Sequence, residues 1–299
     1  MIAVRFGIYG ATTVLFGLSA FCLYSLRTHE RRGALASRGW PIASAGAGLL
    51  LSAVWLVLLA SSMAAVPLWP VDRAAVGALL SGSAIGTAWK VRMIALLTAG
   101  LAATRPQGLP VVVISSGCAL ATLAWTGHGA VDERIVGWVH LGADILHLVA
   151  SAAWVGALVG LVLLVARPVA RIDRDHLGLT HRALHGFGAV GTMVVGLIVV
   201  TGLINSWLVV GVGSLASLPA TLYGQLLIAK LALFAVMLGL ASLNRFRLTP
   251  AFERAIAAAD HRGALGSLRR SLALETGCVT LILGLVAWLG TLAPPASAM

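Results

Sequence analysis

Residues 139–165 read VHLGADILHLVASAAWVGALVGLVLLV, and this stretch decides the fold class of the chain. Apart from two histidines, Asp144 is its one ionisable residue. A run of roughly 20 apolar residues is enough for a helix to cross the hydrocarbon core of a bilayer. The stretch exceeds that length, so we expect a transmembrane helix that begins in the headgroup layer before it enters the core.

The rest of the chain repeats this pattern. Of the 299 residues, 59% are hydrophobic and 10% are charged, whereas a soluble domain has about 25% charged residues. We therefore predict an all-α, polytopic membrane helical bundle that forms a single membrane domain over residues 1–299. Eight stretches are long and apolar enough to span the membrane, namely 6–26, 42–64, 84–103, 109–127, 139–165, 187–210, 223–243 and 272–293.

Basic residues are distributed unevenly between the two predicted sides of the membrane. The net charge is +11, which in a soluble protein would suggest nucleic acid. Here the loops after the first, third, fifth and seventh stretches carry most of the arginines, and the opposite side has only Arg5, Arg73 and Arg134. An excess of Lys and Arg marks the cytoplasmic face. Both termini are therefore predicted to face outward, which in a bacterium is the periplasm, with the lipid bilayer and no nucleic acid as partner.

Residues 1–128 and 136–299 show weak similarity to each other. Three matched pairs carry it, at offsets of 138 or 139: Gly86 with Gly224, Arg92 with Lys230, and Gly17 with Gly156. The pattern indicates two four-helix halves of the same orientation, as found among transporters. Chance matches between helices rich in glycine and alanine are the alternative.

Nearly all intramembrane polar residues fall in the predicted outer half of the bundle. Such groups are costly in lipid and usually face the protein interior or a water-filled cavity. In the stretch 139–165, His140, Asp144 and His147 follow at i, i+4 and i+7, which places them on one helix face. His128, at the end of the preceding helix, is a candidate third nitrogen ligand. Imidazoles beside a carboxylate indicate a site for a divalent or borderline-soft metal.

Each of these residues has a plainer interpretation. His140 is alternatively a solvated interfacial residue, whereas His147 lies deeper and needs a hydrogen-bond partner. Met63 and Met93 lie at similar depth, either as soft ligands or as apolar fillers.

The acidic residue of the stripe has a second interpretation as well. Asp144 is either a ligand or the ion-pair partner of Arg92 or Lys230, and such a pair would hold the histidine face in register without touching a metal. Asn205 is expected near the outer end of its helix, at the depth of this group.

The cytoplasmic half of the bundle is expected to hold little comparable chemistry. Glu275 is placed close enough to its helix end to reach the interface. His176, His181 and His185 are interpreted as a solvated loop and helix start, because neighbouring arginines disfavour a cation site.

Several segments resemble motifs of the copper resistance protein D (CopD) family. Residues 144–158, DILHLVASAAWVGAL, resemble the hallmark helix of that family, in which a histidine is followed by small residues and Trp-Val-Gly. Further segments similar to family motifs follow in the expected order, and they are Thr126–His128, Val200–Trp207, Tyr223–Lys230, Leu243–Arg247 and Leu268–Glu275, with a weaker match at Trp89–Arg92. The resemblance implies an inner-membrane protein of copper homeostasis that handles copper arriving from the periplasm. Family members often work beside, or fused to, a small periplasmic copper-binding protein of the CopC type.

The resemblance also implies roles for the polar residues. His128, His140 and His147 would be copper ligands, and Asp144 a ligand or the group that orients one. Arg92 and Lys230 would set the electrostatics of the site, while Asn205 and Trp154, which lie in matched motifs, would support it.

Two other functions are weighed against copper handling. A b-type haem protein needs two axial ligands on facing helices, for which His147 and His128 are the candidates. A scaffold subunit would use its polar layer only for structure. The sequence has no HExxH, phosphate-binding loop or catalytic triad pattern, so we expect no enzyme, and ion movement would be downhill, ion-coupled or driven by a partner.

Overall fold

The computed structural model describes residues 1–31, 39–126, 135–168, 174–211, 218–258 and 262–292. Throughout these ranges the ordered elements are helices, and none of the described residues forms a strand. The elements are α1 (Ile2–Ser25), α3 (Gly39–Ala64), α4 (Arg73–Gly82), α5 (Ala84–Ala103), α6 (Leu109–Ala121), η1 (Thr122–Thr126), α7 (Ile135–Val165), α8 (Arg174–Val210), η5 (Leu218–Ala220), α9 (Leu222–Leu243), the π-helical η6 (Asn244–Leu248), α10 (Thr249–Ala257) and α11 (Arg262–Leu289).

The predicted all-α membrane bundle is confirmed. Seven helices are long and apolar enough to cross a membrane, and the shorter apolar segment Leu109–Trp125 corresponds to the remaining predicted span. The protein is therefore a multi-pass membrane protein. The starts of α8 and α11 were predicted too late, because their first turns carry Arg, His or Asp and fail a hydropathy test. Short α4 was missed for the same reason, although Asp72 caps it by accepting hydrogen bonds from the backbone N–H groups of Ala74 and Ala75.

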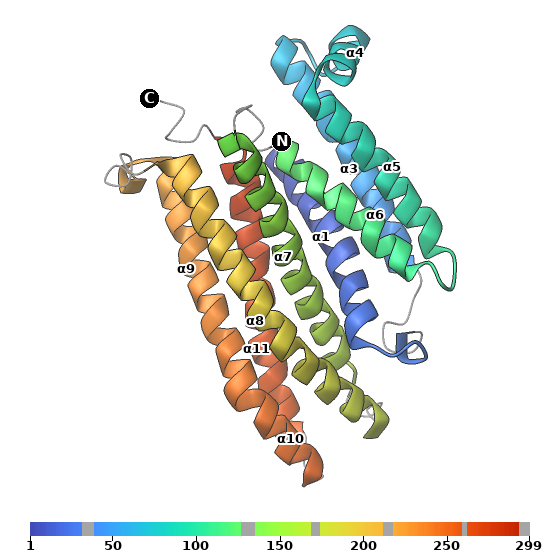
Figure 1. Ribbon diagram of the computed structural model, residues 1–299, viewed down its shortest axis with the longest axis vertical. Coiled ribbons are helices and arrows are strands. Elements are labelled where there is room, and N and C mark those ends of the chain that lie inside the picture. Colours follow the sequence, from blue (N-terminus) through green and yellow to red (C-terminus); the bar gives the residue numbers. More distant parts are fainter. Residues whose placement is uncertain (32–38, 127–134, 169–173, 212–217, 259–261, 293–299) are drawn as a thin grey trace.

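Helix α1 lies at the centre of the bundle and joins two groups of helices (Figure 1). On one side it packs against α3 and α6, with α5 completing that group. On its other side it packs against α7 and α11, to which α8 and α9 are attached. Helix α9 packs on α11 and has few direct contacts with α8. The α8–α9 side of the bundle is thus held together mainly through α7 and α11.

The contact between α1 and α7 depends on two glycines. A Cβ atom added to Gly17 would overlap the carbonyl oxygen of Ala152, and one added to Gly156 would overlap the backbone of Gly17. In lipid, where helices associate by packing and not by exclusion of water, small residues allow this close approach. Gly17 and Gly156, which match each other when residues 1–128 are compared with residues 136–299, are therefore in contact in the fold.

The starts of α5 and α9 share a second local feature. Ser83 Oγ accepts a hydrogen bond from Gly86 N–H at 2.9 Å, and Thr221 Oγ1 accepts one from Gly224 N–H at 3.1 Å. Both are N-cap bonds, which satisfy a backbone donor at the start of a helix. The matched residues Gly86 and Gly224 thus occupy the same position in equivalent caps.

Helix α1 begins and α11 ends at the same end of the bundle (Figure 1). We call this the terminal end, and the opposite one, which holds α10, the arginine-rich end.

Candidate functional site

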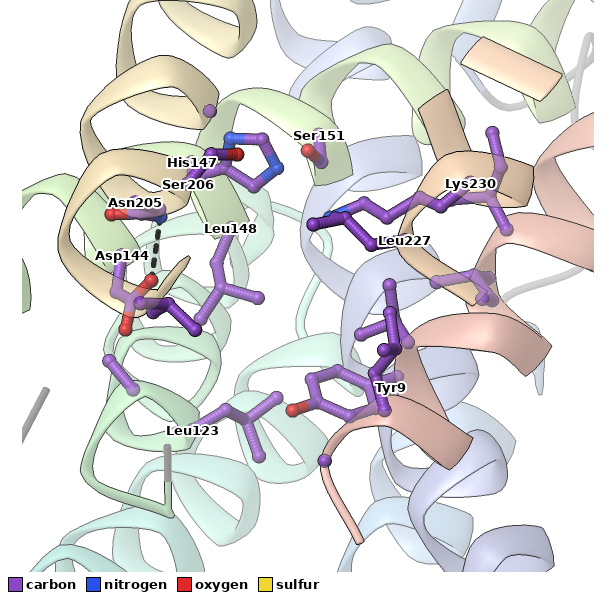
Figure 2. A pocket seen from close by; sticks show the side chains of 18 of the residues that line it. Tyr9, Leu123, Asp144, His147, Leu148, Ser151, Asn205, Ser206, Leu227 and Lys230 are labelled. Carbon is purple, nitrogen blue, oxygen red and sulfur yellow. Dashed lines mark hydrogen bonds between the residues drawn. The ribbon is translucent and has the colours of Figure 1, made fainter. Parts of the chain in front are cut away.

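A polar cavity of about 260 Å³ lies inside the bundle, toward its terminal end. Helices α1, α7, α8, α9 and α11 line it, together with η1. Five of the candidate residues named from the sequence line this cavity. They are His140, Asp144 and His147 from α7, Asn205 from α8 and Lys230 from α9. We call this space the first cavity. Figure 2 shows Asp144, His147 and Asn205 on one side of it and Lys230 reaching in from the other.

Asp144 is held by two neighbours. Its Oδ1 accepts a hydrogen bond of 2.7 Å from Asn205 Nδ2, and its Oδ2 lies 3.8 Å from His140 Nε2. No described Lys or Arg nitrogen lies within 4.0 Å of this carboxylate. An ion pair with Arg92 or Lys230, one of the two interpretations of Asp144 from the sequence, is thus not among the ion pairs of the described residues. Asn205 instead fixes the orientation of the carboxylate.

His147 is held through its Nδ1 atom, which lies 3.0 Å from Thr201 Oγ1. That hydroxyl is also 2.5 Å from the carbonyl oxygen of Leu197, to which it donates. A hydroxyl has a single proton, so with Thr201 donating to Leu197 we assign His147 the tautomer in which Nδ1 donates to Thr201. The neutral imidazole then carries its lone pair on Nε2, which no described residue occupies. Metal-binding histidines are oriented by this kind of outer hydrogen bond.

The opposite wall of the first cavity is cationic. Lys230 is half-buried and makes no ion pair with any described residue. Arg5 of α1 is 9% exposed, and its buried Nε has no hydrogen-bond partner. Tyr9 lies below this wall, and its hydroxyl points into the cavity (Figure 2). The cavity thus combines two cationic groups with one carboxylate, so a bound metal ion would be drawn to the α7 side.

Arg92 does not line this cavity. Its side chain is 1% exposed, and it donates from Nε to Thr122 Oγ1 at 2.9 Å and from Nη2 to the Thr122 carbonyl at 3.1 Å. Its guanidinium also lies 5.8 Å from the centre of the Trp55 ring. Arg92 thereby ties α5 to η1 and lies apart from the histidine stripe.

The remaining candidates lie elsewhere. Trp154 lines a different cavity, described below, where its ring meets Phe187 edge-on at 5.5 Å. Met63 is 67% exposed, and Met93 is half-buried on α5 without lining either cavity. His128 lies outside the described residues.

The first cavity is not a preformed metal cage. Within the described ranges, no three His, Cys, Asp or Glu side chains converge closely enough to hold a metal ion. Its volume also argues against haem, because even pockets for drug-sized ligands start at roughly 300 Å³. What the cavity offers is one oriented carboxylate, one imidazole with a free lone pair and a second imidazole beside them.

A second cavity of about 640 Å³ lies toward the arginine-rich end, between α7, α8, α9, η6, α10 and α11. Glu275 lines it, is 3% exposed and accepts a hydrogen bond from Asn244. The expectation that Glu275 reaches the interface is therefore wrong, since α11 begins several turns earlier than predicted. The solvated interpretation is also wrong for His176, which is 7% exposed and lies 2.8 Å from the carbonyl of Leu164.

Sequence reasoning missed several residues of the first cavity. Arg5 was counted only as a topology signal, and Tyr9 was not considered. Tyr223, which lines the cavity, and Thr201, which lies behind His147, appeared only within segments that resemble family motifs. A single hydroxyl in an apolar helix gives no signal of its own. The spacing of Thr201 from Asn205, one helical turn, was the available hint that both face α7.

Fold and cavity together define a class: a polytopic helical membrane protein with a polar, histidine-containing cavity inside the bundle. Two family models match the chain. The model for the copper resistance protein D-like N-terminal domain matches residues 1–140, and the model for copper resistance protein D matches residues 181–289. With the full-length relative described next, these matches show that the chain belongs to the copper resistance protein D family.

Three relatives span different shares of the chain. Copper resistance protein D of Pseudomonas syringae pv. tomato is 44% identical over 300 residues, which cover 98% of this chain and 96% of the relative. Copper transport protein CutJ of Bacillus subtilis (strain 168) is 36% identical over 126 residues, or 42% of this chain and 22% of that protein. Inner membrane protein YebZ of Escherichia coli (strain K12) is 27% identical over 210 residues, covering 69% of this chain and 67% of the relative. No solved structure matches the chain.

Proposed function

We propose that this protein binds copper in the first cavity and moves it across the inner membrane of a bacterium. The observation that carries the proposal is the state of His147, whose Nδ1 is fixed by Thr201 and whose Nε2 is free to bind a metal. Asp144 and His140 lie on the same face of α7 and share the cavity. The family and the names of two relatives, copper resistance protein D and copper transport protein CutJ, supply copper as the cargo.

The loose arrangement of ligands suits a transported ion. A conducted ion must bind well enough to enter and weakly enough to leave. A closed cage of three or four ligands would retain copper, whereas an oriented carboxylate with imidazoles beside it allows capture and release. Asn205 would keep Asp144 aimed at the ion, and the cationic wall at Lys230 would favour release.

Charge distribution supports a periplasmic opening for the first cavity. The cavity lies toward the terminal end, while most loop arginines lie at the opposite end, in keeping with the excess of positive charge on cytoplasmic faces. In this orientation both termini are periplasmic. Copper would enter from the periplasm and meet the α7 face first.

A periplasmic delivery partner is part of the proposal. The resemblance to family members that work beside CopC-type copper-binding proteins supports it. If such a protein delivers the ion, a copper-loaded CopC-type protein added outside reconstituted vesicles should raise copper uptake above that from an equal amount of free copper. Equal uptake from both sources would contradict direct delivery.

The proposal is tested by the copper content of the purified full-length protein after loading with Cu(I) or Cu(II). Wild type should retain about one copper per chain in at least one oxidation state, and His147→Ala should lose it. His29→Ala, which removes an exposed loop histidine, is the matched control and should behave like wild type. Retention of copper by His147→Ala, or none in wild type under either condition, would contradict the proposal.

A further inference from the structure

The second cavity contains a buried acid without a cationic partner. No described Lys, Arg or His nitrogen lies within 4.0 Å of the Glu275 carboxylate. Its one hydrogen bond comes from the side-chain amide of Asn244. An ionised carboxylate buried in this way is costly, and such groups exchange their charge for a proton unless a counter-ion is present. Ionisable residues inside membrane proteins commonly mark ion or proton pathways.

The other charged groups of the second cavity are engaged or remote. They are His185 from α8, Arg245 from η6 and Glu253 from α10, while the described residues that line it from α7 and α9 bear no charge. Arg245 donates to the carbonyl of Gly188 at 2.8 Å and to the Thr192 hydroxyl. Glu253 lies 3.7 Å from His181. Glu275 is therefore the one buried charge of this cavity among the described residues.

Two residues that line the second cavity, Trp154 and Asn244, each have a buried polar atom without a hydrogen-bond partner. Trp154 Nε1 is a donor and Asn244 Oδ1 an acceptor, and neither makes a hydrogen bond. A carboxylate only accepts hydrogen bonds, so the Trp154 N–H suits its ionised form. A protonated carboxyl also donates, so the Asn244 oxygen suits its neutral form. The lining of the second cavity thus holds one unused donor and one unused acceptor, and the acceptor belongs to the residue that already contacts Glu275.

The local backbone also differs from an ordinary helix. Asn244 is the first residue of the π-helical segment η6, inserted between α9 and α10. Such π segments are often found at functional sites. A metal is a poorer candidate than a proton here, because no group of three potential ligands converges anywhere in the described part of the chain. A single carboxyl group is sufficient to bind a proton, whereas a metal ion needs several ligands.

We propose that Glu275 is a proton-binding site, reached through the second cavity, that takes up and releases a proton as the protein moves its ion. A proton from water in the cavity adds to the carboxylate and is later returned, with no other bond made or broken. Helices α7, α8, α9 and α11 line both cavities, so a change of charge at Glu275 acts on helices that also form the first cavity. The coupling to ion movement rests on the proposed function, whereas the proton site itself does not.

Infrared difference spectroscopy of the full-length protein in lipid, recorded as pH is varied, tests the proton site. Wild type should show the carbonyl stretch of a protonated carboxyl that disappears as pH rises, and Glu275→Gln should lose that band. Glu253→Gln removes the acid of the same cavity that is 68% exposed, and it should retain the band. A band that persists in Glu275→Gln, or its absence from wild type at every pH, would overturn the proposal.

A second variant tests the proton site even if Glu275→Gln fails to fold. Asn244→Leu leaves the carboxyl in place and removes its hydrogen-bond partner, so the band should remain but shift in frequency or in its pH midpoint. An unchanged band in this variant would contradict the assignment to Glu275.

The coupling between proton binding at Glu275 and copper movement is tested in vesicles that contain the full-length protein. A pH gradient should change the rate of copper uptake by wild type, and Glu275→Gln should lose this dependence while keeping copper bound in the first cavity. Gradient dependence that survives in Glu275→Gln overturns the coupling but leaves the proposed function intact. If the protein binds no copper at all, the proposed function fails, and the infrared result still decides the proton site.

Discussion

Arg92 and Lys230 occupy matched positions in the two halves of the chain, yet their surroundings differ. Arg92 is enclosed, with its guanidinium bonded to the hydroxyl and carbonyl of Thr122 and placed beside Trp55. Lys230 lines the first cavity and pairs with no described residue. One basic group is satisfied within the protein, and the other faces a space shared with Asp144 and His147.

This difference separates a structural use of a membrane-buried charge from a functional one. A buried charge that has its own hydrogen-bond partners holds helices together, whereas one left unpaired beside a cavity is available to a ligand. By this criterion Arg92 is structural, whereas Lys230, like Arg5 of α1 on the same cavity wall, is available to a ligand.

Arg92→Ala should destabilise the protein strongly. It empties a fully buried site and removes two hydrogen bonds, and large-to-small changes of this kind cost about 2–5 kcal/mol. Lys230→Ala, its matched control, should cost about 1 kcal/mol or less because it vacates an existing cavity. Denaturant unfolding in detergent, followed by tryptophan fluorescence, measures both. Equal losses of unfolding free energy in the two variants would contradict the distinction between a structural Arg92 and a functional Lys230.

Asp144→Asn should weaken copper binding without changing the fold. It keeps the size of the side chain and removes the negative charge that draws a cation to the α7 wall, so we expect a loss of about tenfold to 100-fold, the range for groups that orient metal ligands. Asp175→Asn, at the exposed start of α8, is the control. Competition with a copper chelator gives the affinities. Unchanged affinity in Asp144→Asn would argue for a purely structural carboxylate.

Thr201→Val should weaken copper binding by about tenfold, the lower end of the range for outer hydrogen-bond partners of metal ligands. It removes the hydroxyl that accepts the Nδ1 proton of His147. The imidazole is then no longer held in the tautomer whose Nε2 lone pair can bind a metal. Thr201→Ser retains the hydroxyl and should restore the affinity. The tautomer assigned to His147 is wrong if Thr201→Val and Thr201→Ser bind copper equally.

Lys230→Gln should strengthen copper binding slightly. Removal of one positive charge from the far wall of the cavity relieves a repulsion of about 1 kcal/mol, equivalent to a few-fold in affinity. Lys90→Gln, an exposed lysine on α5, should have no effect. Weaker binding in Lys230→Gln would mean that the ammonium group positions the ligands instead of opposing the ion.

Much of the site followed from helix period and membrane depth. The i, i+4, i+7 spacing placed His140, Asp144 and His147 on one face, and the predicted chain directions brought Asn205 and Lys230 to the same layer. The sequence could not reveal that Arg92 turns toward Thr122, because rotamers decide which partner a long side chain reaches. Glu275 was misplaced because a hydropathy window starts α11 ten residues late, at 272 instead of Arg262.

The central claim is that copper binds on the α7 wall of the first cavity. Anomalous difference density at the copper absorption edge, from crystals of the copper-loaded protein, locates the metal without a variant. The account predicts a peak beside His147 Nε2 and the Asp144 carboxylate. A peak outside this cavity, for example at His181 and His185 or at Met63, would contradict it.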